Sequence, residues 1–298
     1  MQSKTALISG LGIAGPTLAY WLNAAGYETT IVERAPALRR GGYVVDFWGL
    51  GYDIAERMNF GDDLERTGYH MREVRIVGSR GKRRAGFGTD VFRDLAGGRF
   101  ITIARSDLSR LLYEKIAGRT KVLFGDDVAA LDERADAVNV RFTSGAERRF
   151  ALVFGTDGLH SNIRRLVFGP QDRFEKQLGY AVAAFEVPGY RPRDGDIYVL
   201  YSQPGRMVGR FALHEDCTLF LFVFHTGTTT LPISLAEQKA MLAERYRDDD
   251  WECPQILAAL EHAEDLYFDR ISQIRMVSLV METGAGSLGV NTISSVRT

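Results

Sequence analysis

Cysteine, histidine and net charge are scarce in this sequence, and each scarcity excludes a class of protein. The two cysteines among the 298 residues, Cys217 and Cys253, stand in no metal-binding or redox spacing, a pattern typical of the reducing cytosol. We therefore expect a cytoplasmic protein. The five histidines show no ligand spacing, so we expect no metal site. A net charge of −1 gives no reason to expect nucleic acid as a partner.

Long apolar runs are also absent. The longest, Cys217 to Phe224, is too short to cross a bilayer and is typical of a buried strand. The chain begins almost directly with a strand pattern and shows no signal peptide, so we expect no membrane association. The length suits about two domains, and the sequence has no internal repeat or low-complexity linker.

A glycine-rich N-terminal motif is what the sequence does contain. Residues 5–9 form an apolar strand pattern, residues 10–15 supply G-x-G-x-x-G, a helix pattern follows, and a second strand at 29–32 leads to Glu33. In such a unit the glycines allow a tight turn, close approach of a pyrophosphate and close helix packing, while the acid binds ribose hydroxyls. The candidate dinucleotide-binding residues are Gly10, Gly12, Ile13, Ala14, Gly15, Glu33 and Arg34.

The rest of the chain divides into an α/β part and a mostly β part. We predict a helix at 52–58, a hairpin from Arg72 that turns at 79–81, and a strand and helix at 99–118 with Ser106 as N-cap. Three further strands are predicted within 121–154, at 121–125, 137–145 and 148–154. From 178 the pattern becomes an antiparallel set of strands, followed by helices at 235–247 and 254–262 and a strand at 266–276. The predicted fold is therefore α/β, a Rossmann-like domain with an inserted, mostly antiparallel β domain.

Two further features bear on the cofactor. Arg105 lies between a predicted strand and helix, where a guanidinium can reach the phosphates or ribityl chain of a flavin dinucleotide. Taken alone, it is better interpreted as a surface cation beside Asp107. The second feature is the segment 155–169, in which Asp157 and Gly158 follow a buried strand. This segment exceeds what a surface turn needs.

Together these residues resemble the class A flavoprotein monooxygenases, the para-hydroxybenzoate hydroxylase-like aromatic hydroxylases. The residues that carry the resemblance are Gly10, Gly12, Gly15 and Glu33 in the first motif, Arg105 in the second, and Gly155, Asp157, Gly158, Ser161 and Arg164 in the third, where Thr156 replaces the usual alanine. The resemblance covers roughly residues 3 to 276. It implies FAD-binding segments at 1–70 and 100–172, a substrate-domain hairpin at 71–99, the substrate domain at 173–275 and an atypical tail at 276–298.

The resemblance also implies an activity. NADPH or NADH reduces FAD, and the reduced flavin and O2 then hydroxylate a small aromatic or polyketide-like substrate. No catalytic side chain is expected, and His160 is interpreted as structural. Most aromatic residues of the substrate-domain strands are expected to be core, with a few lining a flat apolar pocket: Phe185, Tyr198, Tyr201, Phe211, Phe220, Phe222 and Phe224. The oligomeric state stays open.

The tail departs from the family pattern. The family's third FAD motif, a glycine–aspartate segment followed by a helix, should follow residue 276, but residues 276–298 contain no aspartate and no proline. We therefore expect a truncated end in which the parallel sheet lacks its final strand, residues 277–298 are mobile or form an imperfect strand, solubility is marginal and FAD is retained poorly. The alternatives are a non-catalytic remnant that binds FAD weakly and a flavin-free NAD(P) reductase.

Overall fold

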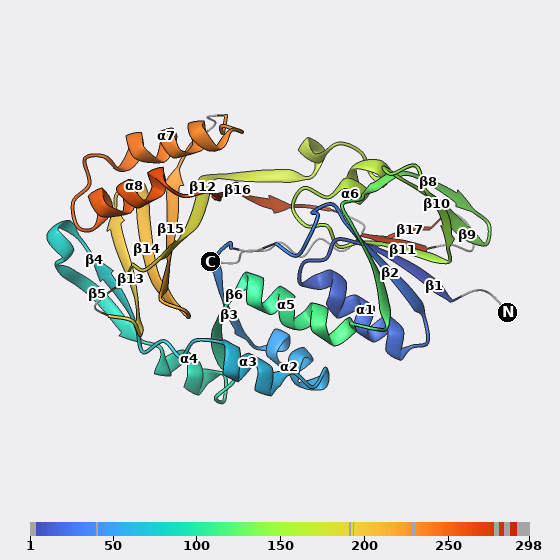
Figure 1. Ribbon diagram of the computed structural model, residues 1–298, viewed down its shortest axis with the longest axis horizontal. Coiled ribbons are helices and arrows are strands. Elements are labelled where there is room, and N and C mark those ends of the chain that lie inside the picture. Colours follow the sequence, from blue (N-terminus) through green and yellow to red (C-terminus); the bar gives the residue numbers. More distant parts are fainter. Residues whose placement is uncertain are drawn as a thin grey trace. The chain divides into compact units, whose positions relative to one another are not determined.

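The chain divides into two compact units, each with its own sheet and core. The computed structural model describes residues 4–39, 41–190, 192, 194–227, 230–276, 280–282 and 287–290. Unit 1 comprises Met1–Arg39, Ser106–Gln177 and Ser272–Thr298, and unit 2 comprises Arg40–Arg105 and Leu178–Ile271 (Figure 1).

The central sheet of unit 1 is mostly parallel. Its strands, in spatial order, are β17 (Val280–Glu282), β18 (Ser287–Val290), β11 (Leu152–Gly155), β1 (Thr5–Ser9), β2 (Glu28–Glu33) and β7 (Thr120–Phe124). Strand β1 pairs in parallel with β2 on one side and with β11 on the other, and helix α1 (Ala14–Ala24) connects β1 to β2. This arrangement confirms the α/β fold predicted from the N-terminal motif.

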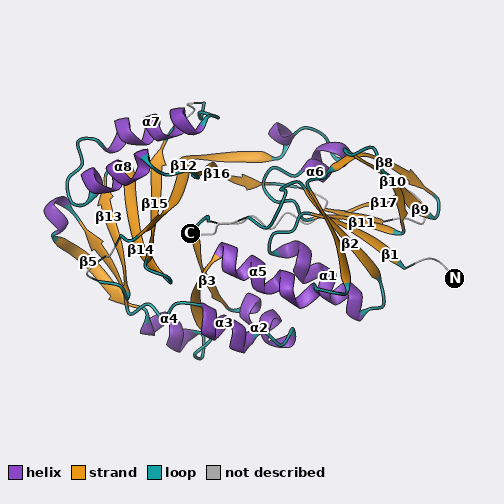
Figure 2. Cartoon of the chain, in the orientation of Figure 1, coloured by secondary structure: helices purple, strands orange, loops and turns teal. Residues whose placement is uncertain are grey.

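Alternating side chains bury both faces of this sheet, as expected for parallel strands. Leu7, Val32 and Val153 join a core with residues of a three-stranded sheet, whereas Ile8 and Ile31 join a core that includes residues of α1 and α5. The covering elements are β8 (Val128–Arg134), β9 (Ala137–Phe142), β10 (Glu147–Phe150), α6 (Asn162–Val167) and α5 (Arg105–Ile116) (Figure 2).

Three local predictions for unit 1 are wrong. The apolar run 148–154 is not one strand, because it divides between β10 and β11, which lie in different sheets. Ser106 is not an N-cap, because α5 begins at Arg105, whose N–H donates to the Tyr43 carbonyl at 3.0 Å. The sheet does not lack a strand beside β11, because β18 pairs with it in parallel, which agrees with the alternative of a strand within 277–298. The rest of the prediction for the tail, at 277–279, 283–286 and 291–298, lies outside the described residues.

The main sheet of unit 2 has seven strands. In spatial order they are β16 (Tyr267–Ile274), β12 (Glu175–Pro188), β15 (Cys217–His225), β14 (Arg206–Leu213), β13 (Ile197–Gln203), β4 (Glu73–Val77) and β5 (Arg83–Gly88). The pairs β12–β15, β14–β15 and β13–β14 are antiparallel, as predicted. The predicted hairpin β4–β5 also forms, and β4 joins the sheet in parallel with β13.

Helices cover one face of this sheet. Helices α7 (Leu235–Tyr246) and α8 (Cys253–Glu261) bury a core against alternate residues of its strands (Figure 1). The remaining elements of unit 2 are β3 (Val44–Trp48), α2 (Leu50–Arg57), α3 (Gly61–Thr67), the short 3-10 turn at Ser79–Gly81, α4 (Asp90–Leu95) and β6 (Phe100–Ala104), which pairs with β3. No helix within the described residues has the length and apolar character to cross a membrane.

Candidate cofactor and substrate sites

The glycine loop lies where the order of the parallel strands reverses. Strand β1 leads into α1 and β2 on one side, while β11 lies on the other, so the carboxyl end of β1 is a switch point of the kind that binds ligands in open α/β sheets. The Gly10 N–H donates to the Val32 carbonyl at 2.8 Å, and the Thr156 N–H donates to the Ser9 carbonyl at 2.8 Å. The loop is thus fixed to both neighbouring strands.

Two glycines of the motif occupy positions that no side chain fits. Gly10 has φ +105°, and a Cβ there would lie 2.8 Å from Asp157 Cα. A Cβ on Gly15 would lie 2.0 Å from the Gly10 carbonyl oxygen. The first glycine motif and the Asp157 segment, which are far apart in sequence, are therefore in direct backbone contact. The close approach of helix and loop leaves the space that a pyrophosphate requires.

The first turn of α1 has no internal cap. Its N-cap residue, Ile13, makes no side-chain capping bond, and no acidic residue lies in the first turn of this fully described helix. Gly12, Ile13 and Ala14 are all half-buried. The backbone N–H groups and the dipole at this end are complementary to phosphate oxygens, so the loop fits the pyrophosphate of a dinucleotide.

The Glu33 carboxylate accepts hydrogen bonds from the backbone of the glycine loop and of the residues that follow β2. Its Oε2 accepts from the Leu11 N–H at 2.8 Å, and its Oε1 accepts from the Ala35 N–H at 2.9 Å. Each carboxylate oxygen keeps further acceptor capacity, which fits the ribose hydroxyls of a dinucleotide. Arg34 follows directly and is exposed.

Asp157 caps the helix that follows it. Its Oδ2 accepts from the N–H groups of Asn162 and Ile163 at 2.8 and 3.0 Å, and its Oδ1 accepts from the Ser161 hydroxyl at 2.5 Å. Ser161 is the N-cap of α6 and accepts from the Arg164 N–H at 3.0 Å. The neighbouring Gly158 has φ +81°, which favours glycine. Asp157 and Ser161 thus stabilise the start of α6, and this role does not depend on a bound cofactor.

The hydroxyl of Thr156 is a feature that sequence reasoning missed. Thr156 Oγ1 lies 2.8 Å from the Ser9 carbonyl oxygen and 3.2 Å from that of Gly10, and donates to them. Thr156 occupies the position at which the family that the sequence resembles usually has alanine. The substitution is therefore the signal that should have drawn attention to a contact between the two motifs.

Arg164 is a fully buried cation of unit 1. Its Nη2 donates to the Leu159 carbonyl at 2.6 Å, while Nε and Nη1 have no partner among the described residues. Burial lowers the pKa of Arg164, although the Asp157 and Glu175 carboxylates act in the opposite direction. His160, in the same segment, contacts Gln171 through Nδ1 at 3.1 Å, consistent with a structural role.

Arg105 begins α5 and is half-buried. No group within the described part of the chain bonds to its guanidinium, so the side chain keeps all its donors for a ligand. Its assignment to the cofactor stays a prediction.

Replacement of Glu33 or Arg105 by alanine is expected to weaken FAD binding by about 1–3 kcal/mol each, because each loses hydrogen bonds to a charged or polar partner. Titration of each purified variant with FAD, followed by flavin fluorescence, measures this loss. Glu28→Ala, at the exposed opposite end of β2, and Arg110→Ala, exposed on α5, are matched controls that should bind FAD as the parent does. Parent-like affinity in both test variants would refute the assignment.

Asp157→Ala is expected to weaken FAD binding and also to lower the free energy of unfolding by about 1–3 kcal/mol, because three hydrogen bonds at the start of α6 are lost. Urea denaturation of the FAD-free protein measures the stability change separately from the cofactor. The exposed Asp172 serves as control, since Asp172→Ala should change neither quantity. Unchanged stability in Asp157→Ala would contradict the capping role.

The aromatic residues predicted for the substrate domain divide between two faces of its sheet. Tyr198 and Phe211 point to the face of the sheet that the helices do not cover and belong to a second cluster there. The helix-covered core contains the other five: Phe185, Tyr201, Phe220, Phe222 and Phe224. All seven residues thus pack in one of two hydrophobic clusters, as expected for core residues, and the expected flat apolar pocket stays a prediction. The second cluster, here the aromatic face, comprises Tyr43, Val44, Tyr69, Met71, Ala184, Tyr198, Phe211, Leu213, Leu219, Leu221 and Tyr267.

Tyr198 supplies a polar group to the aromatic face. Its hydroxyl lies over Gly209, where a Cβ would approach it to 2.8 Å, and makes no hydrogen bond within the described residues. Burial, and next the Asp46 carboxylate, raise the pKa of the Tyr198 phenol, which therefore stays neutral. Asp46 is oriented by the Thr102 hydroxyl, which donates to it at 2.7 Å. The aromatic face thus combines apolar rings with a neutral phenol and a carboxylate.

Comparisons with known proteins identify the same cofactor class. The family model described as "FAD binding domain" matches residues 3–250. An uncharacterized protein of Mycobacterium tuberculosis is 38% identical over 293 residues, covering 92% of this chain and 74% of its own length. A flavin-dependent monooxygenase from an unknown prokaryotic organism is 30% identical, covering 92% of this chain and 71% of its own. Among solved structures, the tetracycline destructase Tet(51) is 27% identical with a TM-score of 0.81, covering 96% of this chain and 73% of its own.

Proposed function

Because the chain belongs to the FAD-dependent class A flavoprotein monooxygenases, we propose that it hydroxylates a small aromatic or polyketide-like compound with NADPH as reductant and O2 as oxidant. The strongest support is the uncapped first turn of α1, which lies with Glu33 and the Asp157 segment at the switch point of the parallel sheet.

The residues of unit 1 would hold FAD in distinct ways. The N–H groups of Gly12, Ile13 and Ala14 would bind the pyrophosphate, Gly10 and Gly15 would keep the approach open, and Glu33 would bind the ribose. Arg34, Asp157 and Gly158 complete the proposed set within unit 1, and Arg105, the last residue of the first segment of unit 2, is added on the family resemblance alone. Bound FAD supplies the redox chemistry between NADPH and O2, and the protein positions the substrate and excludes water.

The aromatic face of unit 2 is the proposed substrate surface. Its rings offer apolar contacts to a flat compound, and Tyr198 with Asp46 offers a hydrogen-bond donor and acceptor for orientation. A neutral phenol and a carboxylate are complementary to a substrate that carries both a carbonyl and a hydroxyl group. The similarity to a protein named tetracycline destructase supports a fused-ring, polyketide-like substrate.

Tyr198→Phe is expected to raise the KM for such a substrate about tenfold, with little change in FAD affinity, because only the orienting hydroxyl is lost. Substrate-stimulated NADPH oxidation by the FAD-saturated protein measures KM and kcat. Tyr190→Phe is the matched control, since Tyr190 belongs to the helix-covered side of the sheet and should leave KM unchanged. A KM equal to that of the parent in Tyr198→Phe would remove Tyr198 from substrate binding.

A substrate panel tests the proposed class. FAD-saturated protein is incubated with NADPH and O2 and offered single-ring phenols, fused-ring phenolic ketones and aliphatic acids of similar size. We expect stimulation of NADPH oxidation and transfer of an oxygen atom from O2 into product with the aromatic compounds only. Oxygen transfer to the aliphatic acids, or to none of the aromatic compounds, would contradict the proposed substrate class.

A further inference from the structure

The peptide group between Gly10 and Leu11 is held by two side chains of unit 1. Its carbonyl oxygen accepts a hydrogen bond from Thr156 Oγ1 at 3.2 Å, and its N–H donates to Glu33 Oε2 at 2.8 Å. A trans peptide carries its C=O and N–H groups on opposite edges. Thr156 and Glu33, which are far apart in the sequence, therefore hold the same peptide group from opposite sides.

Gly10 gives this peptide group freedom to rotate. Its φ is +105°, a conformation that is open to glycine and that leaves the neighbouring peptide groups few steric constraints. A half-turn of the peptide would direct the Gly10 carbonyl oxygen toward the Glu33 carboxylate, so that two acceptors would face each other. The hydroxyl on one side and the carboxylate on the other thus select a single orientation.

The Thr156 hydroxyl lies where the glycine loop meets the first turn of α1. It also donates to the Ser9 carbonyl at 2.8 Å, so its hydrogen is shared between two successive carbonyl groups. A Cβ on Gly15 would lie 3.0 Å from Thr156 Oγ1. Thr156 is 8% exposed, and hydrogen bonds that are shielded from water are stronger and less easily replaced by solvent.

We propose that Thr156 is a positioning residue for the ribose of FAD, acting on Glu33 through the peptide between Gly10 and Leu11. The N–H of this peptide and that of Ala35 each bind one oxygen of the Glu33 carboxylate, so the orientation of the peptide helps to fix the plane of that carboxylate. The inference rests on the proposed function, because it requires FAD in this site.

Alanine at this position is usual in the family, so the hydroxyl tightens a site that forms without it. We therefore expect a graded loss of affinity. Thr156→Ala removes the hydroxyl and should weaken FAD binding about fivefold, the loss of about one hydrogen bond, whereas Thr156→Ser keeps the hydroxyl and should bind within about twofold of the parent. Flavin fluorescence measures both affinities.

ADP serves as a second probe, because it carries the ribose and the pyrophosphate without the flavin. If Thr156 acts on the ribose end of the site, Thr156→Ala should weaken ADP binding by the same factor of about five. Isothermal titration calorimetry measures this affinity. A loss seen with FAD and absent with ADP would overturn the assignment to the ribose.

Thr29→Ala is the matched control that separates positioning from stability. Thr29 is 1% exposed, and its hydroxyl lies 2.8 Å from both Asn23 Oδ1 and Thr120 Oγ1, near the start of β2, whereas Glu33 is the last residue of that strand. Thr29→Ala should lower the urea midpoint, as Thr156→Ala does, but should bind FAD and ADP as the parent does. An equal loss of affinity in Thr29→Ala would reduce the effect of Thr156 to stability.

A double-mutant cycle tests whether Thr156 acts through Glu33. Without the Glu33 carboxylate there is no group to position, so adding Thr156→Ala to Glu33→Ala should weaken ADP binding by less than about twofold further. A further loss of about fivefold would show that the two residues act independently and would overturn the proposed route.

The remaining outcomes distinguish this inference from the proposed function. Parent-like affinity for FAD and ADP in Thr156→Ala, or an equal loss in Thr156→Ser, would overturn the role of the hydroxyl and leave the FAD site as proposed. A parent protein that binds neither FAD nor ADP would contradict the proposed function itself, and the role of Thr156 with it.

Discussion

Gly15→Ala is expected to abolish detectable FAD binding and to lower the free energy of unfolding by about 3 kcal/mol. The added methyl carbon would lie 2.0 Å from the Gly10 carbonyl oxygen and 3.0 Å from Thr156 Oγ1. Backbone atoms cannot yield as a flexible side chain does, so α1 must move away from the loop. That movement displaces the N–H groups proposed to bind the pyrophosphate. Urea denaturation and FAD titration measure the two effects.

Gly61→Ala is the matched control for this substitution. Gly61 also lies in the first turn of a helix, but the nearest atom to an added Cβ is Glu56 Cγ at 3.6 Å, an ordinary contact. Its stability and FAD affinity should equal or exceed those of the parent, since alanine favours a helix. Parent-like FAD binding by Gly15→Ala would show that the loop does not need the close helix approach that we describe.

Tyr246→Ala is expected to destabilise unit 2 by about 3–5 kcal/mol, the usual cost of removing a large buried aromatic ring. Tyr246, the last residue of α7, is fully buried, and its ring contacts Phe222 and Phe224. Its hydroxyl lies 3.1 Å from the Met207 carbonyl oxygen and 3.2 Å from that of Val223. Substitution leaves a cavity and two carbonyl groups without this donor. Denaturant unfolding with far-ultraviolet circular dichroism measures the loss.

Tyr246→Phe separates the ring from the hydroxyl. It keeps the packing and loses only the hydrogen bonds, so we expect a cost of about 1 kcal/mol. A loss in Tyr246→Ala no larger than that in Tyr246→Phe would contradict the assignment of this face as the core of the unit. The aromatic face would then no longer be the side of the sheet opposite the core, and its proposed role as substrate surface would lose that support.

The sequence predicts best the elements whose signals are local. Strand β1 has the predicted bounds, and β2 differs from its prediction by one residue at each end, because strand patterns, glycines and a helix pattern follow one another without interruption. The helices of the substrate domain were predicted for the same reason, since each combines an apolar period with clear ends. The contact between the glycine loop and the Asp157 segment was not predicted, because the two segments are about 145 residues apart in the sequence.

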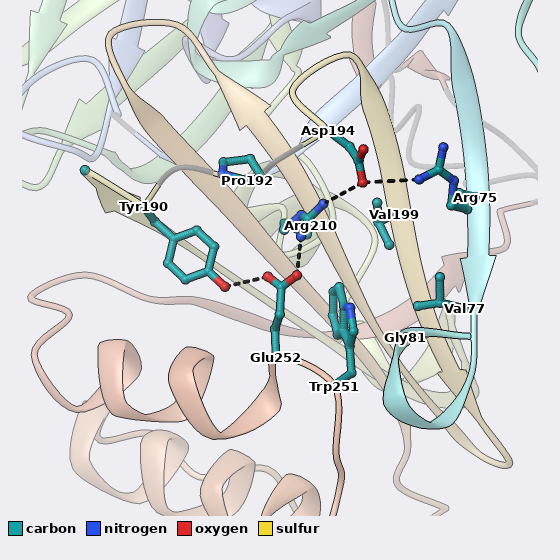
Figure 3. Close-up of a pocket in the computed structure, with 11 residues that line it drawn as sticks. Arg75, Val77, Gly81, Tyr190, Pro192, Asp194, Val199, Arg210, Trp251 and Glu252 are labelled. Atoms are coloured by element: carbon teal, nitrogen blue, oxygen red, sulfur yellow. Dashed lines mark hydrogen bonds and ion pairs between the residues drawn. The ribbon is translucent and has the colours of Figure 1, made fainter. Parts of the chain in front are cut away.

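Elements that depend on distant partners were missed or misjudged. Strand β3 has no fully buried residue and forms through its pairing with β6, more than 50 residues away. Strand β18, with the sequence Ser-Leu-Gly-Val, forms by pairing with β11, more than 130 residues earlier in the chain. A cavity of about 560 Å³ beside Trp251 in unit 2 depends on a left-handed backbone and on four segments that tertiary structure brings together (Figure 3), and neither is visible in a sequence pattern.

The most direct test of the account is oxygen transfer by the chain reconstituted with FAD. The purified protein is saturated with FAD, supplied with NADPH, a fused-ring phenolic substrate and ¹⁸O2, and the product is analysed by mass spectrometry. We predict a yellow protein that oxidises NADPH with O2 uptake and places one ¹⁸O atom in the product, and a Gly15→Ala variant that does neither. Protein that stays colourless with added FAD, or that oxidises NADPH equally well without flavin, would contradict the account.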